Sequence, residues 1–328
     1  MNFRSFRDLD LDIKEGIGKI RRRNHDLVVG IPRSGIIPAH MIALLLNLNC
    51  MDLPSFCRNA DIAHGNTRKP GRPLQRAWDA RRILLVDDSV RSGRSMTAAL
   101  REIPPGFRGE ITTLAVYSST PEREDVDAFL RHLPPPRIFE WNVYHHGVIG
   151  NAGLDMDGVL CVDPTREQND DGANYRRFME TAEPLILPTR TIKTIVTNRL
   201  EKYRAQTEAW LHRHQVEFER LVMLDLPTAE ERRRLRIHAR HKAEVYGDSD
   251  LELFIESEPR QAREIFRLTG RPVFCVENGT LYHCSQRPGI DGRRRILTRA
   301  GAYGRALPEP VKTILRPFYR RLALMLQP

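Results

Sequence analysis

Two adjacent carboxylates, Asp87 and Asp88, follow an apolar run and precede a loop rich in serine, glycine and arginine. The loop from Ser89 to Ser95 offers hydroxyl groups, a glycine and the start of an expected helix, and these together suit a bound phosphate. Carboxylates repel a phosphate, so the acidic pair is expected to bind something uncharged that is attached to it. Neighbouring sugar hydroxyls meet this need, and a phosphorylated ribose carries both groups.

A second pair of carboxylates, Asp155 and Asp157, follows another apolar segment and precedes a glycine. Residues two apart on an extended segment share one side of it. One carboxylate can attack phosphorus to form an acyl phosphate, while the other protonates the leaving oxygen and then deprotonates a water. A Mg²⁺ ion would offset the repulsion between carboxylate and phosphate. Such a pair by itself is more often a structural turn, and hydrolysis of a phosphate ester is the chemistry that it could carry out.

The segments around the first acidic pair alternate between strand and helix. Strands are expected at Asp26–Pro32, Ile83–Asp88 and Ile111–Ser119, and helices at Ser34–Leu48 and Ser95–Ile103. This alternation predicts a parallel sheet whose functional loops lie at the carboxyl ends of the strands. The polar segment Asn59–Ala80 shows no period and is interpreted as a mobile flap.

A stiff break at Leu133–Pro136 is expected to approach a domain boundary. Beyond it, strands are expected at 149–154, Thr191–Asn198, Leu251–Ser257 and 271–278, with helices at Leu200–His214 and from Thr228 toward Tyr246. With 328 residues, two domains are expected. We predict an α/β protein with domains at 1–136 and 137–300, each a mostly parallel sheet flanked by helices, and a helical tail at 301–328.

Composition bears on whether the protein binds nucleic acid, spans a membrane or holds a zinc ion. The net charge of +10 suits phosphorylated small molecules, and no nucleic-acid-binding motif accompanies it. The opening residues do not resemble a signal peptide and the longest apolar run is too short to span a bilayer, so a cytoplasmic protein is expected. Five scattered cysteines favour reduced thiols, and Cys275, His283 and Cys284 lack the second ligand pair of a zinc site. The sequence leaves open whether the chain forms a homo-oligomer.

The stretch Ile83–Met96 resembles the 5-phosphoribosyl-1-pyrophosphate (PRPP) signature of type I phosphoribosyltransferases. The resemblance implies that Asp87 and Asp88 bind the ribose hydroxyls. It implies that the phosphate is bound by Ser89, Val90, Arg91, Ser92, Gly93, Arg94 and Ser95. It also implies a pyrophosphate loop containing Arg33, Ser34 and Gly35, and a catalytic loop at Asn59–Ala80 whose candidates toward pyrophosphate are Arg68, Lys69, Arg72 and Arg76.

Arg91 departs from the purine-type members of that family, which place an aspartate in this loop as a base toward the purine ring. An arginine cannot act as a general base at neutral pH. An acidic or orotate-like acceptor is therefore more plausible than a 6-oxopurine, unless Arg91 points to solvent.

The stretch Gly153–Leu160 resembles motif one of haloacid dehalogenase (HAD) superfamily phosphatases. The resemblance implies that Asp155 is the nucleophile, that Asp157 is the acid/base, and that Thr197 and Lys242 hold the phosphoryl oxygens, with Lys202 as the weaker rival. The implied Mg²⁺ ligands are Asp155, Asp157 and Glu256. Ser257 stands where an acidic ligand is common, and Glu258 could substitute for it. The interval between the first two motifs leaves room only for a minimal lid, unless the first domain serves as one.

The two resemblances together predict a bifunctional enzyme. It would transfer phosphoribose from PRPP to a base-like acceptor and hydrolyse a phosphorylated small molecule, and the two steps in sequence would yield a dephosphorylated riboside. One alternative is a phosphatase regulated by a non-catalytic domain that senses PRPP or a nucleotide. Another is that the phosphatase half has lost its activity.

Overall fold

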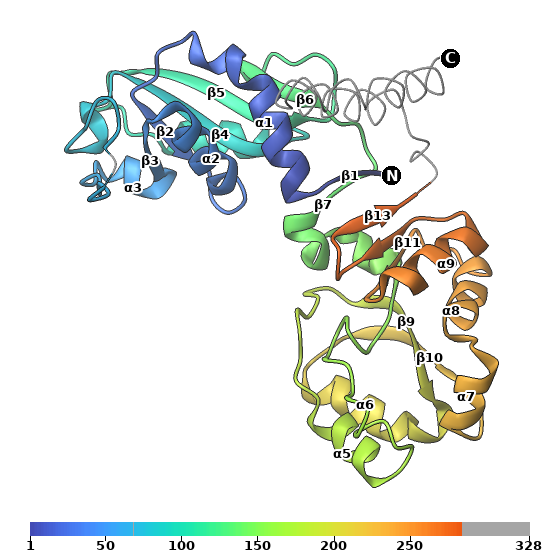
Figure 1. The fold of residues 1–328 in the computed structure, drawn as a ribbon. Coiled ribbons are helices and arrows are strands. Elements are labelled where there is room, and N and C mark those ends of the chain that lie inside the picture. The colour runs from blue at the N-terminus through green and yellow to red at the C-terminus, as the bar shows by residue number, and fades with distance from the viewer. Residues whose placement is uncertain (68, 284–328) are drawn as a thin grey trace, which may run out of the picture.

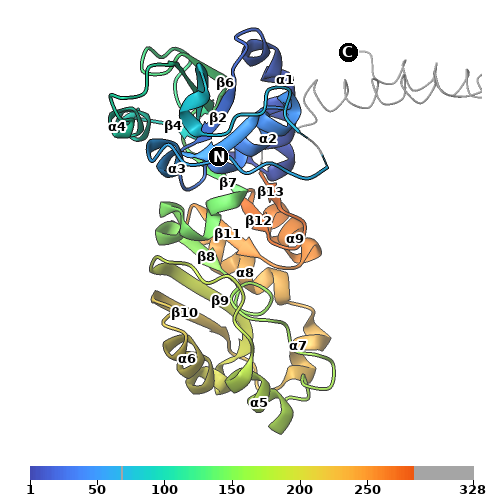
Figure 2. The ribbon, with the colours of Figure 1, turned by 90° about the vertical axis from the view of Figure 1, so that its left-hand side faces the viewer.

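The computed structural model describes residues 1–67 and 69–283 of the chain. Two α/β bodies follow one another along it, one from blue to green and one from yellow to orange (Figures 1 and 2). Each contains a mostly parallel sheet flanked by helices, which confirms the predicted fold class. The predicted tail at 301–328, the cysteine at position 284 and the catalytic-loop candidate Arg68 lie outside the described residues. In the part of the chain described, no helix is both long enough and apolar enough to cross a membrane.

The first sheet has five strands, all parallel, in the order β3-β2-β4-β5-β6. The strands are β2 (Leu27–Gly30), β3 (Asn49–Asp52), β4 (Arg82–Val90), β5 (Glu110–Ser118) and β6 (Ala128–His132). The helices are α1 (Phe6–Arg21), α2 (Ile36–Leu46), α3 (Leu53–Cys57) and α4 (Arg94–Glu102), with a 3₁₀ turn, η1 (Ala77–Asp79).

Both faces of this sheet are covered, and successive residues of the strands alternate between them. In β4, Ile83 and Leu85 belong to the core cluster that contains residues of α3 and α4, while Leu84 and Val86 belong to the cluster that contains α1 and α2. Strand side chains alternate in this way, so a strand buried on both faces is apolar throughout. This explains why an unbroken apolar run leads to the first acidic pair.

The second sheet has six strands in the order β10-β9-β8-β11-β12-β13, and only the β12–β13 pair is antiparallel. The strands are β8 (Ala152–Leu154), β9 (Ile192–Leu200), β10 (Phe218–Leu224), β11 (Leu253–Glu256), β12 (Val273–Cys275) and β13 (Thr280–Tyr282). The helices are α5 (Ala173–Thr181), α6 (Arg204–Arg213), α7 (Ala229–Leu235), α8 (His238–Gly247) and α9 (Pro259–Thr269), with a 3₁₀ turn, η4 (Glu201–Tyr203).

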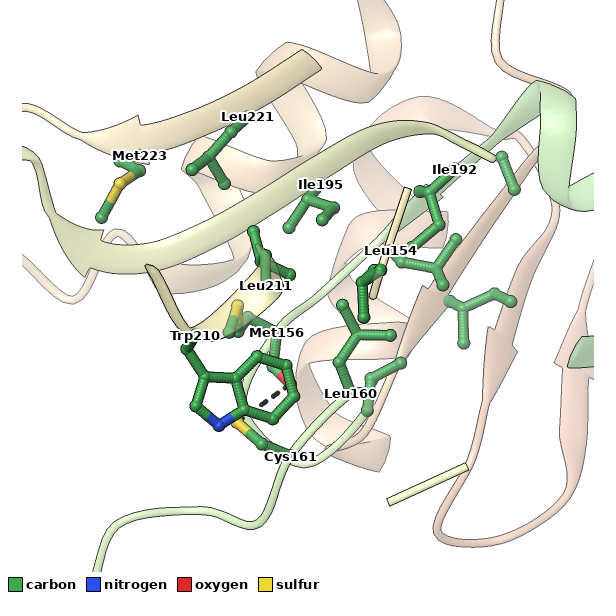
Figure 3. Close-up of a cluster of buried hydrophobic side chains, with 14 of the residues drawn as sticks. Leu154, Met156, Leu160, Cys161, Ile192, Ile195, Trp210, Leu211, Leu221 and Met223 are labelled. Carbon is green, nitrogen blue, oxygen red and sulfur yellow. Dashed lines mark hydrogen bonds between the residues drawn. The ribbon is translucent and has the colours of Figure 1, made fainter. Parts of the chain in front are cut away.

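Trp210 of α6 lies at the centre of the main core of the second body. Figure 3 shows its indole close to Met156 and Cys161, which follow the end of β8. The indole N–H donates to the carbonyl oxygen of Ala182 at 2.8 Å. The segment that carries Asp155 and Asp157 is therefore packed against a buried aromatic side chain.

The segment between the two sheets is tied to the chain's N-terminus. Strand β1 (Asn2–Arg4) pairs in parallel with β7 (Arg137–Phe139), and two 3₁₀ turns follow, η2 (Glu140–His145) and η3 (Gly147–Asn151). Phe3 also packs on Phe274 of β12, with ring centroids 5.4 Å apart. The N-terminal strand therefore touches both the connecting segment and the second body, and the division at residue 136 stays a prediction.

Two expected elements differ from the structure. The helix expected from Thr228 toward Tyr246 is two helices, α7 and α8, because Arg236 adopts a left-handed conformation with a φ of 50°. The expected flap is partly anchored, since Ile62 and Leu74 are buried in the core beneath it. Its Arg72 pairs with Asp26 at 3.0 Å, at the amino end of β2 and away from the acidic pair.

Candidate active sites

The predicted PRPP site lies at the carboxyl edge of the first sheet, where β2 and β4 run side by side. Gly30 pairs with Val86 in the register of these strands, so the loop after β2 meets the acids that follow Val86. Gly35 lies against this edge, because a Cβ there would lie 2.6 Å from the Ile31 oxygen and 2.7 Å from the Val86 oxygen. The absence of a side chain at Gly35 therefore brings the predicted pyrophosphate loop, with Arg33 and Ser34, onto the acidic pair.

Asp87 and Asp88 are both buried, with 7% and 5% of their surface exposed. The Asp88 N–H donates to Asp87 Oδ1 at 2.9 Å, and the indole N–H of Trp141 in η2 donates to Asp88 Oδ2 at 2.8 Å. Burial and the neighbouring Asp88 carboxylate raise the pKa of Asp87 to about 7. A buried, repelling pair of this kind favours a ligand that supplies hydroxyl donors or a cation.

The predicted phosphate loop, from Ser89 to Ser95, ends where α4 begins. Gly93 has a φ of 75°, and a Cβ there would collide with the Asp125 carboxylate, so this position needs glycine on both counts. Asp125 pairs with Arg123, whose Nη1 donates to the Arg91 carbonyl at 3.0 Å. Arg123 and Asp125 thus contact the backbone of the loop and stabilise it, although neither belongs to the predicted motif.

The second site gathers around Lys242 of α8, which is buried. Its Nζ lies 2.6 Å from Asp155 Oδ2 and 2.7 Å from Glu256 Oε2. Asp155 comes directly after β8 and Glu256 ends β11, and these strands are neighbours in the sheet. Burial raises the pKa of Asp155, the Lys242 ammonium opposes this, and the Glu256 carboxylate adds to the rise. Three of the predicted residues are therefore in contact at one sheet edge.

The other predicted residues, Thr197 and Asp157, line the same cavity as Asp155 and Lys242, which has a volume of about 630 Å³. The Asp157 side chain is held by Arg199, whose Nη2 lies 2.5 Å from Asp157 Oδ1. Arg199 is fully buried and its Nε also donates to the Asp157 carboxylate, at 3.0 Å. Lys202, the rival of Lys242, instead pairs with Asp171 at 2.9 Å and is 41% exposed.

The residues that line this cavity come from the second body. The segment between β8 and β9 supplies several lining residues, among them Asp163, Asn169 and Tyr175. Within the described ranges, every lining residue has a number of 155 or higher. The second body therefore supplies the described lining of the cavity, and the minimal lid stays a prediction.

Mg²⁺ prefers oxygen ligands, and the cavity supplies them. Ser257 Oγ lies 3.4 Å from the backbone oxygen of Asp157 and 3.3 Å from Glu256 Oε1, with Asp163 adjacent to Gly158 beside them. Residues 1–67 and 69–283 nevertheless contain no group of three His, Cys, Asp or Glu side chains arranged to hold a metal. The predicted ligand set is thus not assembled: the Asp157 carboxylate faces Arg199, and Lys242 bridges Asp155 and Glu256.

Sequence reasoning missed Trp141, Arg199 and Asp163. Trp141 lies 53 residues from Asp88 and Arg199 lies 42 residues from Asp157, so neither contact carries a local signal. Asp163 lines the cavity, and partial desolvation together with the carboxylates of Asp157 and Glu256 raises its pKa. Its position shortly after the first motif was the available hint.

No family model and no curated protein matches the chain. Among solved structures, the chain is similar to a purine phosphoribosyltransferase from Pyrococcus horikoshii Ot3 (18% identity, 43% of this chain and 92% of that chain, TM-score 0.31). It is also similar to a xanthine-guanine-hypoxanthine phosphoribosyltransferase from Helicobacter pylori (20% identity, 43% and 93% covered, TM-score 0.32). A third is a hypothetical protein from Neisseria gonorrhoeae with bound ppGpp (14% identity, 43% and 90% covered, TM-score 0.31).

Proposed function

We propose that the protein is a bifunctional enzyme that transfers phosphoribose from PRPP to a base-like acceptor and hydrolyses a phosphate monoester. One observation carries the proposal: each sheet presents a buried acidic centre at its carboxyl edge, Asp87 with Asp88 in one and Asp155 with Glu256 in the other. Ligands of open α/β sheets bind at that edge.

In the first reaction, Asp87 and Asp88 hold the ribose hydroxyls and the loop from Ser89 to Ser95 holds the 5-phosphate. A nitrogen of the acceptor forms a bond to C1 of the ribose, the bond from C1 to the pyrophosphate oxygen breaks, and any acceptor proton passes to solvent. Arg33, which is exposed in the loop after β2, would bind the departing pyrophosphate. The bound Mg²⁺ of this reaction would neutralise charge on the departing pyrophosphate.

In the second reaction, an Asp155 oxygen attacks phosphorus, the ester P–O bond breaks, and the alcohol leaves with a proton. Water then hydrolyses the aspartyl phosphate and restores Asp155. Lys242 stabilises the oxygens of the transferring phosphoryl group. Asp157 serves as the acid and base only after its carboxylate turns from Arg199 toward the leaving oxygen. Lys242, which lies between Asp155 and Glu256, reduces the repulsion between carboxylate and phosphate.

The experiment is a paired assay of the full chain with PRPP, Mg²⁺ and a panel of bases, with pyrophosphate and inorganic phosphate measured separately. Asp88→Asn should abolish pyrophosphate release and leave hydrolysis of a phosphate ester intact. Asp155→Asn should do the reverse and accumulate a phosphorylated riboside. The matched control is Asp250→Asn, an exposed aspartate in the loop before β11. If PRPP binds and changes phosphatase activity but pyrophosphate is never released, the first body is a sensor.

A further inference from the structure

A second cavity of about 460 Å³ lies where the connecting segment meets both bodies. It is lined by Ser89 and Arg91 from the loop after the acidic pair, by Arg137 of β7, by Asn142 and His146, and by Glu252 from the second body. This volume suits a small molecule. Ser89 directly follows Asp88, and Trp141, which donates to Asp88, directly precedes Asn142. The cavity therefore adjoins the place where the ribose would be held.

Positive charge dominates this cavity. Two arginines, the exposed Arg91 and the half-buried Arg137, line the cavity with one acidic side chain, Glu252, which itself accepts from Asn151 at 3.3 Å. Across residues 1–67 and 69–283, neither Arg91 nor Arg137 forms an ion pair with an acidic side chain. The 16 ion pairs of these ranges include neither arginine, although Asp88 attracts Arg137 from a distance. Two unpaired guanidinium groups beside a cavity attract an anion.

Contacts with Phe139 and Leu133 hold the Arg137 side chain at the cavity. Its guanidinium carbon lies 5.6 Å from the centre of the Phe139 ring, and its Nη1 reaches only the Leu133 carbonyl, at 3.5 Å. Burial lowers the pKa of Arg137, and the charges of Arg91 and Arg123 lower it further. A half-buried cation in a positive field gains more from a negative ligand than an exposed one does. Asn142 adds a buried Oδ1 without a hydrogen-bond partner.

We propose that this cavity binds the acceptor of the phosphoribosyl transfer, and that the acceptor is a nitrogen heterocycle bearing a carboxylate. The inference rests on the proposed function, because it assigns the acceptor of that same reaction. A guanidinium matches a carboxylate with two parallel hydrogen bonds. The carboxylate takes no part in the bonds that change: the ring nitrogen bonds to C1, pyrophosphate leaves, and the carboxylate stays ionised.

The test uses matched acceptors that differ in one charged group: orotate against uracil, and nicotinate against nicotinamide. The full chain with PRPP and Mg²⁺ should release pyrophosphate with a carboxylated acceptor at a kcat/KM at least about tenfold above that of its uncharged partner. Arg137→Gln should raise the KM for the acid by about 10-fold or more, since it removes a charge-assisted pair. The Kd for PRPP should not change. Arg108→Gln, at an exposed arginine before β5, is the matched control.

Equal use of the charged and uncharged partners would overturn the inference, as would an Arg137→Gln variant that affects both alike. Arg137→Lys keeps the charge and should recover part of the loss, which guards against a folding defect. Calorimetry of orotate and nicotinate with the PRPP-bound chain separates the two proposals. Binding that depends on Arg137 without pyrophosphate release would uphold the anion site and overturn the transferase. Pyrophosphate release with uncharged acceptors alone would do the opposite.

Discussion

Lys242 places its ammonium between two carboxylates of neighbouring strands, 2.6 Å from Asp155 Oδ2 and 2.7 Å from Glu256 Oε2. All three residues are at most 5% exposed, so water screens this contact little. The carboxylates raise the pKa of Lys242 despite its burial, and it stays charged. The ammonium therefore balances charge in the cavity and also positions the proposed nucleophile.

We expect Lys242→Met to lower the free energy of unfolding by about 3–5 kcal/mol, because it leaves two carboxylates buried without a counter-charge. The loss should be greater at pH 8 than at pH 5, where the carboxylates can take up protons. Lys202→Met, at an exposed lysine paired with Asp171, should cost at most about 1 kcal/mol. Denaturant unfolding of the full chain measures both, and equal losses would contradict a special role for Lys242.

Asp87 should make stability depend on pH in a definite direction. Its pKa is about 7 in the folded chain against 3.8 in the reference state, so between these values the unfolded chain loses the proton first. Rising pH therefore destabilises the folded chain across this window through Asp87. Asp87→Asn should remove this pH dependence. Between pH 5 and pH 7.5, the free energy of unfolding of the variant should therefore increase by about 1–3 kcal/mol relative to that of the wild type. Melting temperatures of both proteins at the two pH values test this, and parallel curves would refute it.

Trp141 should report on PRPP binding, because its indole N–H donates to Asp88. The chain has three tryptophans, and the indole N–H groups of Trp78 and Trp210 donate to backbone oxygens. We expect PRPP with Mg²⁺ to change the intrinsic fluorescence, and Trp141→Phe to remove that change. Trp141→Phe should also weaken PRPP binding by about 5–10-fold, since one hydrogen bond to a charged group is lost. Trp78→Phe is the matched control, and a signal that survives in Trp141→Phe would contradict the assignment.

The local pattern of the sequence predicts the strands that carry the acids, because a buried apolar run leads into Asp87 within β4 and into Asp155 after β8. It does not predict the strands β3, β6, β10 and β13. It also predicts Lys242 on a helix, since that helix follows the strand motifs in order. Helix α1 was missed, although Ser5 and Asp8 cap it reciprocally at 3.1 and 3.0 Å. The break at Arg236 has no glycine or proline to announce it.

The contacts that complete the sites could not be read from the sequence, because they join residues far apart in the chain. Arg199 sits two residues beyond the predicted Thr197, yet only the folded sheet brings it to Asp157. Ser257 appears as a lost metal ligand in the sequence, whereas in the structure it lies beside Glu256 and Asp163 at Gly158. Whether Lys242, Arg199 or a metal pairs with these carboxylates is decided by the tertiary structure, which no local sequence pattern reports.

The two proposed sites open at the carboxyl edges of two different sheets. This arrangement affects how the product of the first reaction would reach the second site. The connecting segment meets the second sheet at its amino edge, where Asn151 and Glu252 line the junction cavity, and it also lies against the β12–β13 turn, where Gly279 is close to Glu140. Asp155 and Thr197 open at the opposite, carboxyl edge. If both proposed sites are active, we expect an intermediate formed at Asp87 and Asp88 to leave the first site and to reach Asp155 through solvent.

We expect the phosphorylated riboside to appear in free solution before inorganic phosphate, with a lag that shortens as enzyme concentration rises. An equimolar mixture of Asp88→Asn and Asp155→Asn chains, each supplying one activity, should then match the wild type at equal concentrations of each active site. Phosphate release at fixed PRPP and acceptor measures both. A wild type that shows no lag and exceeds the mixture severalfold would instead mean that the intermediate is handed over within one chain, and the arrangement of the two sheet edges would have to change during turnover.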